Sequence, residues 1–215
     1  MPSGFPGSID NFTDPLSNSS LSSPSHSGLH SDVNDAIEKI ETYMGLVKVI
    51  PTGATNGTVA ANGTVTIGNA VSSVTVSGAF SALYDNYRLV ISGGVASGAS
   101  DTSLQLSGIT TAVYQISGYY MTPGVATLNA YSPAVATSFL LGSINTVRYA
   151  HTLDLVSPFL TQQKFMVSMN GLSTSGVYSF SGHCTSTASA TGFTIIANGG
   201  QTLTGGTIRV YGYRN

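Results

Sequence analysis

The chain from residue 46 to residue 215 is a series of short runs rich in β-branched and aromatic residues, separated by Gly, Asn, Pro and Ser. No helix pattern, with apolar residues three and four apart, interrupts these runs. They amount to about ten to twelve strand candidates at nearly regular intervals. Regular short strands without crossover helices are typical of antiparallel sheets. The sequence therefore predicts a mainly β fold, an antiparallel jelly-roll-like sandwich over residues 46–215.

Several turns and strands can be located more closely. The dipeptides Asn56-Gly57 and Asn62-Gly63 are typical of hairpin turns. Residues 46–50, LVKVI, form a short apolar strand that is followed by a proline. Residues 207–213 alternate between apolar and polar side chains. We expect this last strand to lie inside a sheet, beside the strand at 46–50, so that it joins the two ends of the domain.

Charged residues make up only 7% of the chain, against about 25% in an average protein. Two interpretations are open: much of the surface is covered in an assembly, or it is a neutral Ser/Thr-rich surface in contact with water. The composition favours the first. The net charge is −2, and Lys and Arg do not cluster. Because phosphate backbones require such clusters, we expect no nucleic-acid partner.

Cys184 is the only cysteine, which leaves no partner for an intrachain disulfide and no Cys-based zinc site. His26 and His30 could meet an ion only if three chains converged on a threefold axis, so we expect no metal and no cofactor. The first ten residues lack the basic start and apolar run of a signal peptide. No run approaches the roughly 20 apolar residues of a membrane span. We expect synthesis in a cytoplasm and no membrane insertion.

Residues 1–30 are punctuated by Pro and Gly and become serine-rich in their second half, without any periodicity. This composition is typical of an extended arm, yet the arm carries widely spaced apolar anchors. These are Phe5, Ile9, Phe12, Leu16 and Leu21. Such a segment gains order by lying on another surface. We therefore predict an N-terminal docking arm over residues 1–30; the alternative is a tail folded back on its own domain.

Residues 31–45, SDVNDAIEKIETYMG, form the one convincing helix pattern in the sequence. Ser31 or Asp32 can cap its start, and Gly45 can end it. The apolar seam of this helix consists of Val33, Ile37, Ile40 and Met44. A lone helix of this length is marginal in water. The seam therefore needs a partner, and two further copies of the chain would supply one, which predicts a homotrimer.

Three segments resemble those of tailed-bacteriophage fibre and minor structural proteins. The first runs from FPGSIDNFTDPLS to the helix, where a Ser-Pro-Ser-His stretch at 23–26 and His30 precede Asp32, Asn34, Asp35, Ala36 and Ile37. The others are FSALYDNYRLVIS and the terminal GGTIRVYGYRN, which are similar to segments of phage jelly-roll modules. The resemblance covers about 70 residues of the chain.

The resemblance implies a virion component, made in the host cytoplasm and commonly trimeric. Its arm would bind a capsid or tail protein, and its jelly roll would face outward for host attachment. The chain is short and has no shaft repeat, which disfavours a long tail fibre. A short head fibre, a small tail spike or a capsid decoration protein remain open. A free carbohydrate-binding β-domain is a further alternative.

Enzymatic chemistry has little support in the sequence. His151 and Asp154 are three residues apart, so on a strand their side chains point to opposite faces. No Gly-x-Ser-x-Gly elbow is present. A glycosidase needs two close carboxylates, and the β-rich part offers only Asp85, Asp101 and Asp154, of which the first two are typical of turns. We therefore expect no catalytic residues.

Carbohydrate binding is the better candidate, because aromatic faces stack on sugar rings. Four tyrosines fall where strands and loops are expected to meet: Tyr119, Tyr120, Tyr131 and Tyr149. They are the candidate contacts for a host surface polysaccharide. The alternative is that these tyrosines pack in the sandwich with their hydroxyls at its rim.

Overall fold

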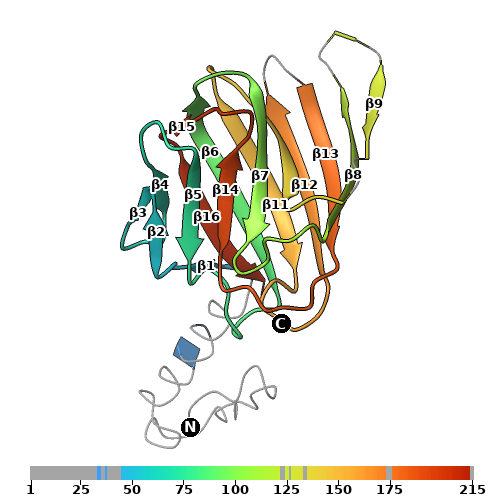
Figure 1. Ribbon diagram of the computed structural model, residues 1–215. Coiled ribbons are helices and arrows are strands. Elements are labelled where there is room, and N and C mark those ends of the chain that lie inside the picture. The colour runs from blue at the N-terminus through green and yellow to red at the C-terminus, as the bar shows by residue number, and fades with distance from the viewer. Residues whose placement is uncertain are drawn as a thin grey trace, which may run out of the picture. The chain divides into compact units, whose positions relative to one another are not determined.

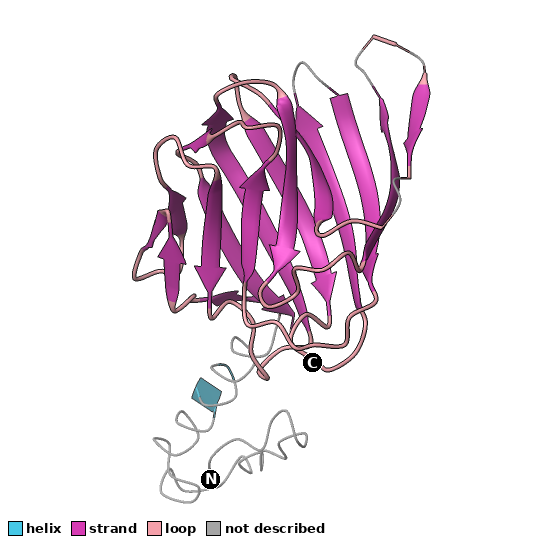
Figure 2. Ribbon diagram, in the orientation of Figure 1, coloured by secondary structure: helices cyan, strands magenta, loops and turns pink. Residues whose placement is uncertain are grey.

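The computed structural model describes Val33, Asn34, Ile37 and residues 45–121, 124, 125, 127–132, 135–172 and 176–213. More than half of this part of the chain lies in antiparallel strands, which are arranged in two sheets (Figure 2). The predicted mainly β, antiparallel fold is confirmed. The residues from Lys48 to Tyr213 belong to one compact unit.

Sixteen strands are present among the described residues, against the ten to twelve expected, because several are only two to four residues long (Figure 1). They are β1 (Leu46–Val49), β2 (Gly53–Thr55), β3 (Gly57–Val59), β4 (Val65–Ile67), β5 (Ser73–Ser77), β6 (Asn86–Ala96), β7 (Ser100–Leu106), β8 (Tyr114–Met121), β9 (Leu128–Tyr131), β10 (Phe139–Ile144), β11 (Tyr149–Val156), β12 (Lys164–Leu172), β13 (Gly176–Cys184), β14 (Phe193–Ala197), β15 (Leu203–Thr204) and β16 (Thr207–Tyr213).

The larger sheet has eleven strands, nine of them in the order β3-β4-β16-β6-β11-β12-β13-β8-β9. Its two other strands lie off this path, where β1 pairs with β16 and β15 with β6. The smaller sheet has the order β10-β7-β14-β5-β2. In Figure 1 the smaller sheet lies in front of the larger one, and β8 and β9 extend past it on the right. The two sheets therefore overlap over only part of the larger sheet.

The core lies between the sheets and follows the alternation of the strands. In β16 every second residue is buried, so Ile208 and Val210 face the core while Arg209 and Tyr211 do not. The smaller sheet contributes Phe193 and Ile195 from β14. Burial of such side chains is the main favourable term in folding, at about 25 cal/mol per Å² of apolar surface.

The structure also corrects one of the turn predictions. Asn62-Gly63 does join an antiparallel pair, β3 and β4, with Gly63 at a φ of 74°. Asn56-Gly57 does not form a hairpin, because β2 belongs to the smaller sheet and β3 to the larger one. Asn56, at a φ of 61°, instead takes the chain from one sheet to the other. The expected position of β16, inside the sheet and beside β1, is confirmed.

The predictions for the N-terminal part fall mostly outside the described residues. The docking-arm residues Phe5, Ile9, Phe12, Leu16 and Leu21 lie outside them. Of the proposed trimer seam, Ile40 and Met44 also lie outside, while Val33 and Ile37 are helical and about half exposed. Arm and seam stay predictions. No helix of the described part is long and apolar enough to span a membrane.

Candidate functional site: an aromatic cleft between the sheets

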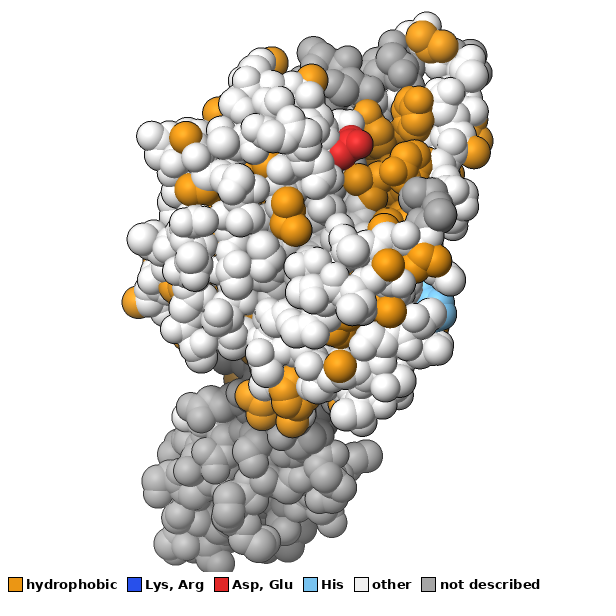
Figure 3. All heavy atoms as spheres, in the orientation of Figure 1, with side chains coloured by type: hydrophobic (Ala, Val, Ile, Leu, Met, Phe, Trp, Pro, Cys, Tyr) orange, Lys and Arg blue, Asp and Glu red, His pale blue; other side chains and the backbone are white. Residues whose placement is uncertain are grey.

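Two antiparallel hairpins, β8–β9 and β12–β13, form the end of the larger sheet that extends past the smaller one. They join each other through the pairing of β13 with β8. Where they pass the edge strand β10, a cleft of about 300 Å³ opens on their inner face. Seven residues line it: Asp101, Tyr120, Tyr131, Leu140, Ser143, Tyr178 and Phe180. Figure 3 shows an acidic side chain beside a group of hydrophobic side chains on this side of the molecule.

All four aromatic rings of the cleft come from the two hairpins. Tyr178 and Phe180 alternate along β13 and are 9% and 2% exposed, so they form the floor. Tyr120 of β8 stacks on Tyr178, with ring centroids 5.5 Å apart. Tyr131 of β9 meets Phe180 edge to face at 5.7 Å. Tyr120 and Tyr131 are only half-buried, so part of each ring remains accessible to a ligand.

The polar end of the cleft comes from the smaller sheet. Asp101 on β7 and Ser143 on β10 are paired across the two strands. Ser143 Oγ donates to Asp101 Oδ1 at 2.9 Å and lies 2.8 Å from Tyr178 Oη. This second contact ties the edge of the smaller sheet to the larger one. Because an ionised carboxylate has about four lone-pair sites, Asp101 has acceptor capacity beyond the bond from Ser143.

The base of hairpin β12–β13 is held by a buried lysine. Lys164 is 0% exposed, and its Nζ donates to the carbonyl oxygens of Leu160, Gln162 and Ser186. The first two carbonyls precede β12 and the third follows β13, so one ammonium group joins both ends of the hairpin. Burial lowers the pKa of Lys164, and the nearby Cys184 thiol raises it by a smaller amount.

The structure separates the four tyrosines predicted from the sequence. Tyr120 and Tyr131 line the cleft. Tyr119, the neighbour of Tyr120 on β8, faces the opposite side of the sheet and is 47% exposed. Tyr149 is 1% exposed in the core, and burial raises its pKa to about 12. We therefore remove Tyr149 from the candidate glycan contacts, because no ligand can reach its ring without opening the core.

Sequence reasoning missed the other half of the cleft. Asp101 was expected to be a turn residue, but it lies in β7. Tyr178 and Phe180 carry the alternation of a strand that buries one face, a signal that was present in the sequence. Their position beside Tyr120 depends on the pairing of β13 with β8, for which the sequence gives no sign.

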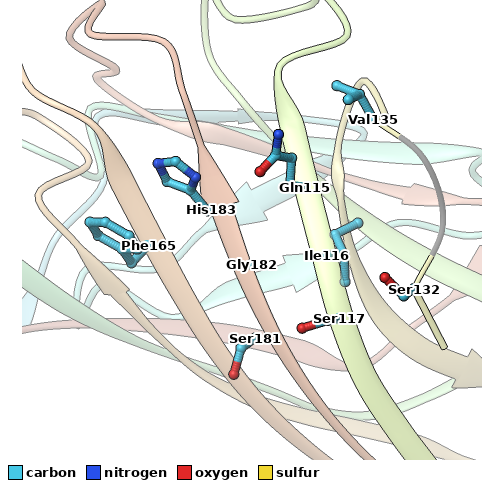
Figure 4. Close-up of a pocket in the computed structure, with 9 residues that line it drawn as sticks. All are labelled: Gln115, Ile116, Ser117, Ser132, Val135, Phe165, Ser181, Gly182 and His183. Atoms are coloured by element: carbon cyan, nitrogen blue, oxygen red, sulfur yellow. The ribbon is translucent and has the colours of Figure 1, made fainter. Parts of the chain in front are cut away.

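A second hollow, of about 530 Å³, lies on the outer face of the same strands. Figure 4 shows Phe165, His183 and Gln115 projecting from β12, β13 and β8. Phe165 stacks on His183 with ring centroids 4.9 Å apart. His183 Nε2 is hydrogen-bonded to Gln163 Oε1 at 2.9 Å. Apart from these two rings its lining is aliphatic, glycine or neutral polar, and it holds no carboxylate. Although this hollow is larger, the cleft brings together more aromatic rings, a charged group and two sheets.

The outer face also carries eight of the sixteen large hydrophobic side chains that the described residues expose. Phe165, Val167 and Met169 alternate along β12 and are 48%, 53% and 67% exposed. The exposed set continues with Val156 on β11, Val177 on β13, Tyr119 and Met121 on β8, and Leu128 on β9. The charged groups Arg88 and Asp154 on this face form a bidentate pair at 2.8 Å, and Tyr213 also donates to Asp154.

The histidine and the aspartate that could support hydrolysis, His151 and Asp154, lie on opposite faces of the sheet, and each has a partner of its own. His151 is buried, and its Nε2 lies 2.9 Å from Thr102 Oγ1. Asp154 lies on the outer face, where Arg88 lowers its pKa. This confirms that His151 and Asp154 point to opposite faces. Within the described ranges, no three His, Cys, Asp or Glu side chains come together as metal ligands would.

Comparison with known proteins adds no identification. No protein-family model matches the sequence, and no curated protein matches it either.

Proposed function

We propose that this chain is a non-enzymatic structural protein of a bacteriophage virion, a short trimeric fibre or spike whose β-domain binds host surface polysaccharide. The observation that carries the glycan-binding part is the cleft, where two half-buried tyrosines, a carboxylate and a serine hydroxyl meet. Sugars present apolar C–H faces, which pack on aromatic rings, and hydroxyl groups, which bond to carboxylates and hydroxyls. A pocket that joins apolar walls with a few polar groups is the usual form of a small-ligand site.

The strand order supports a jelly roll with two inserted hairpins. Without the hairpins, β4-β16-β6-β11 faces β10-β7-β14-β5. Numbered along the chain, these eight strands give the orders 1-8-3-6 and 5-4-7-2, the arrangement of two interlocked Greek keys. Hairpin β8–β9 then interrupts the roll between β7 and β10, and β12–β13 interrupts it between β11 and β14. Both insertions extend the same sheet, and together they carry every aromatic ring of the cleft.

The virion part of the proposal rests on the resemblance of the arm, the helix and the last strand to phage fibre proteins. The arm would bind a capsid or tail protein, and the seam of Val33, Ile37, Ile40 and Met44 would hold three chains together. Three linked domains would strengthen attachment through their effective concentration. A capsid decoration protein is the second candidate. The charged content of only 7% favours it, because a surface with few charges suits a protein that is covered by its neighbours in an assembly.

The test is retention of the full chain on an array of bacterial O-antigen and capsular polysaccharides. We expect the double variant Tyr120→Ala/Tyr131→Ala to lose roughly tenfold to hundredfold in apparent affinity, since it removes two stacking rings. Tyr119→Ala is the matched control, because it removes a neighbouring tyrosine from the opposite face. The proposal for the cleft is wrong if wild type retains no glycan, or if the double variant binds as wild type does.

A further inference from the structure

Asp101 is the one ionisable group, apart from the tyrosine hydroxyls, among the residues that line the cleft. It is half-buried and lies near the start of β7, opposite Ser143 of β10. Its Oδ1 accepts a hydrogen bond from Ser143 Oγ. No Lys, Arg or His belongs to the lining. Any ligand that enters therefore meets a negative charge with no opposing positive charge from the lining.

We propose that the cleft selects saccharides by charge: it takes neutral sugars, takes amino sugars more tightly, and rejects sugars that carry a carboxylate or phosphate. This inference rests on the proposed glycan binding and names its substrate class. Asp101 is the residue that determines the specificity. The tyrosines supply affinity through the apolar C–H face of the sugar ring, which the neutral, amino and acidic forms of one sugar share.

The charge preference follows from three interactions. A hydroxyl of a neutral sugar donates to the spare lone pairs of Asp101, which accepts but cannot donate. The ammonium group of an amino sugar makes a shorter, charge-assisted bond to the same oxygens and is also attracted to a tyrosine face. An acidic sugar places a second anion beside Asp101, and at about 4 Å this repulsion lowers affinity at least about fivefold even in a fully aqueous environment.

The cleft rejects acidic sugars because of the way the two sheets meet. Asp101 belongs to the smaller sheet, while the aromatic rings belong to the hairpins of the larger one. The hydrogen bond between Ser143 and Tyr178 joins these two parts at the cleft. A ring that stacks on Tyr120 or Tyr131 inside the cleft therefore shares the cleft with this carboxylate.

The experiment measures binding of the full chain to an array of oligosaccharides matched in linkage and ring, in neutral, amino and uronic-acid forms. Wild type is expected to bind the amino form best and the uronic-acid form at least about fivefold more weakly than the neutral one. Asp101→Asn keeps an oxygen that can accept from Ser143, so the fold is preserved and the charge is removed. In this variant the preference for the amino form should shrink and the uronic-acid form should approach the neutral one.

Asp154→Asn is the matched control, because it removes a carboxylate from the outer face of the larger sheet. It should keep the wild-type order of the three forms. If wild type binds glycans through the cleft but the three forms bind alike, or if Asp101→Asn keeps the wild-type order, the charge inference is wrong while glycan binding stands. If no form binds and Tyr120→Ala/Tyr131→Ala changes nothing, both are wrong.

Discussion

Replacing Lys164 with methionine should destabilise the domain by about 3 kcal/mol. Methionine keeps the length and most of the volume of the buried stem but removes the Nζ donor. The carbonyl oxygens of Leu160, Gln162 and Ser186 then lose their shared partner. Each of these three bonds to the charged ammonium group contributes about 1 kcal/mol or more. A loss of this size is a large part of a typical stability of about 5–15 kcal/mol.

Urea denaturation of purified wild type and Lys164→Met measures this loss. With a slope near 2 kcal/mol per M, the midpoint should fall by about 1.5 M at unchanged slope. Lys48→Met is the matched control, because the half-buried Lys48 makes a single bond, at 2.9 Å, to Thr64 Oγ1. It should cost less than about 1 kcal/mol. A loss for Lys164→Met no larger than that of Lys48→Met would refute the idea that the ammonium group holds both ends of the hairpin.

Two further predictions concern alkaline stability and assembly. The pKa of Tyr149 is raised by burial to about 12, from an unperturbed value near 10, so the native state holds this proton longer than the unfolded one. This stabilisation is complete below about pH 10, and roughly 2–3 kcal/mol of it is lost as the pH rises through about 12. In Tyr149→Phe, which has no proton to lose here, the urea midpoint should fall less steeply over this pH range. A decline as steep as that of wild type would contradict this. Deletion of residues 1–30 should abolish incorporation into virus particles while native mass still reports a folded trimer, and incorporation that survives the deletion would contradict a docking arm.

The strand content was predictable because it depends on local pattern. Thr207–Tyr213 alternates so regularly that its buried side, with Ile208 and Val210, could be assigned before the structure. The opposite orientation of His151 and Asp154 followed from their separation alone. The glycan candidates Tyr120 and Tyr131 were reached from residue type and expected position, but Tyr119 and Tyr149 were reached by the same reasoning. Residue type alone does not distinguish a ring that lines the cleft from one that is buried in the core or lies on the other face of the sheet.

Strand β12 shows where pattern reasoning fails. Its more hydrophobic set, Phe165, Val167 and Met169, faces outward, and the set with Lys164 and Ser168 faces the core. Hydrophobic pattern normally fixes which face of a strand is buried. Here Lys164 is buried because three loop carbonyls surround its ammonium group. Those carbonyls come from two loops on either side of the hairpin, so the local sequence of β12 does not contain the reason for its orientation.

By itself, then, the sequence determined the class of fold, the alternation of its clearest strands and the supply of tyrosines, since each depends on residues close together in the chain. Only the tertiary structure decided that β8–β9 and β12–β13 extend one sheet past the other. It also decided that β13 pairs with β8, which brings Tyr178 beside Tyr120, and that Asp101 approaches them from the opposite sheet. The physical reason is that pairing and sheet overlap are set by packing between distant segments, and the cleft exists only where that packing leaves the inner face of a sheet uncovered.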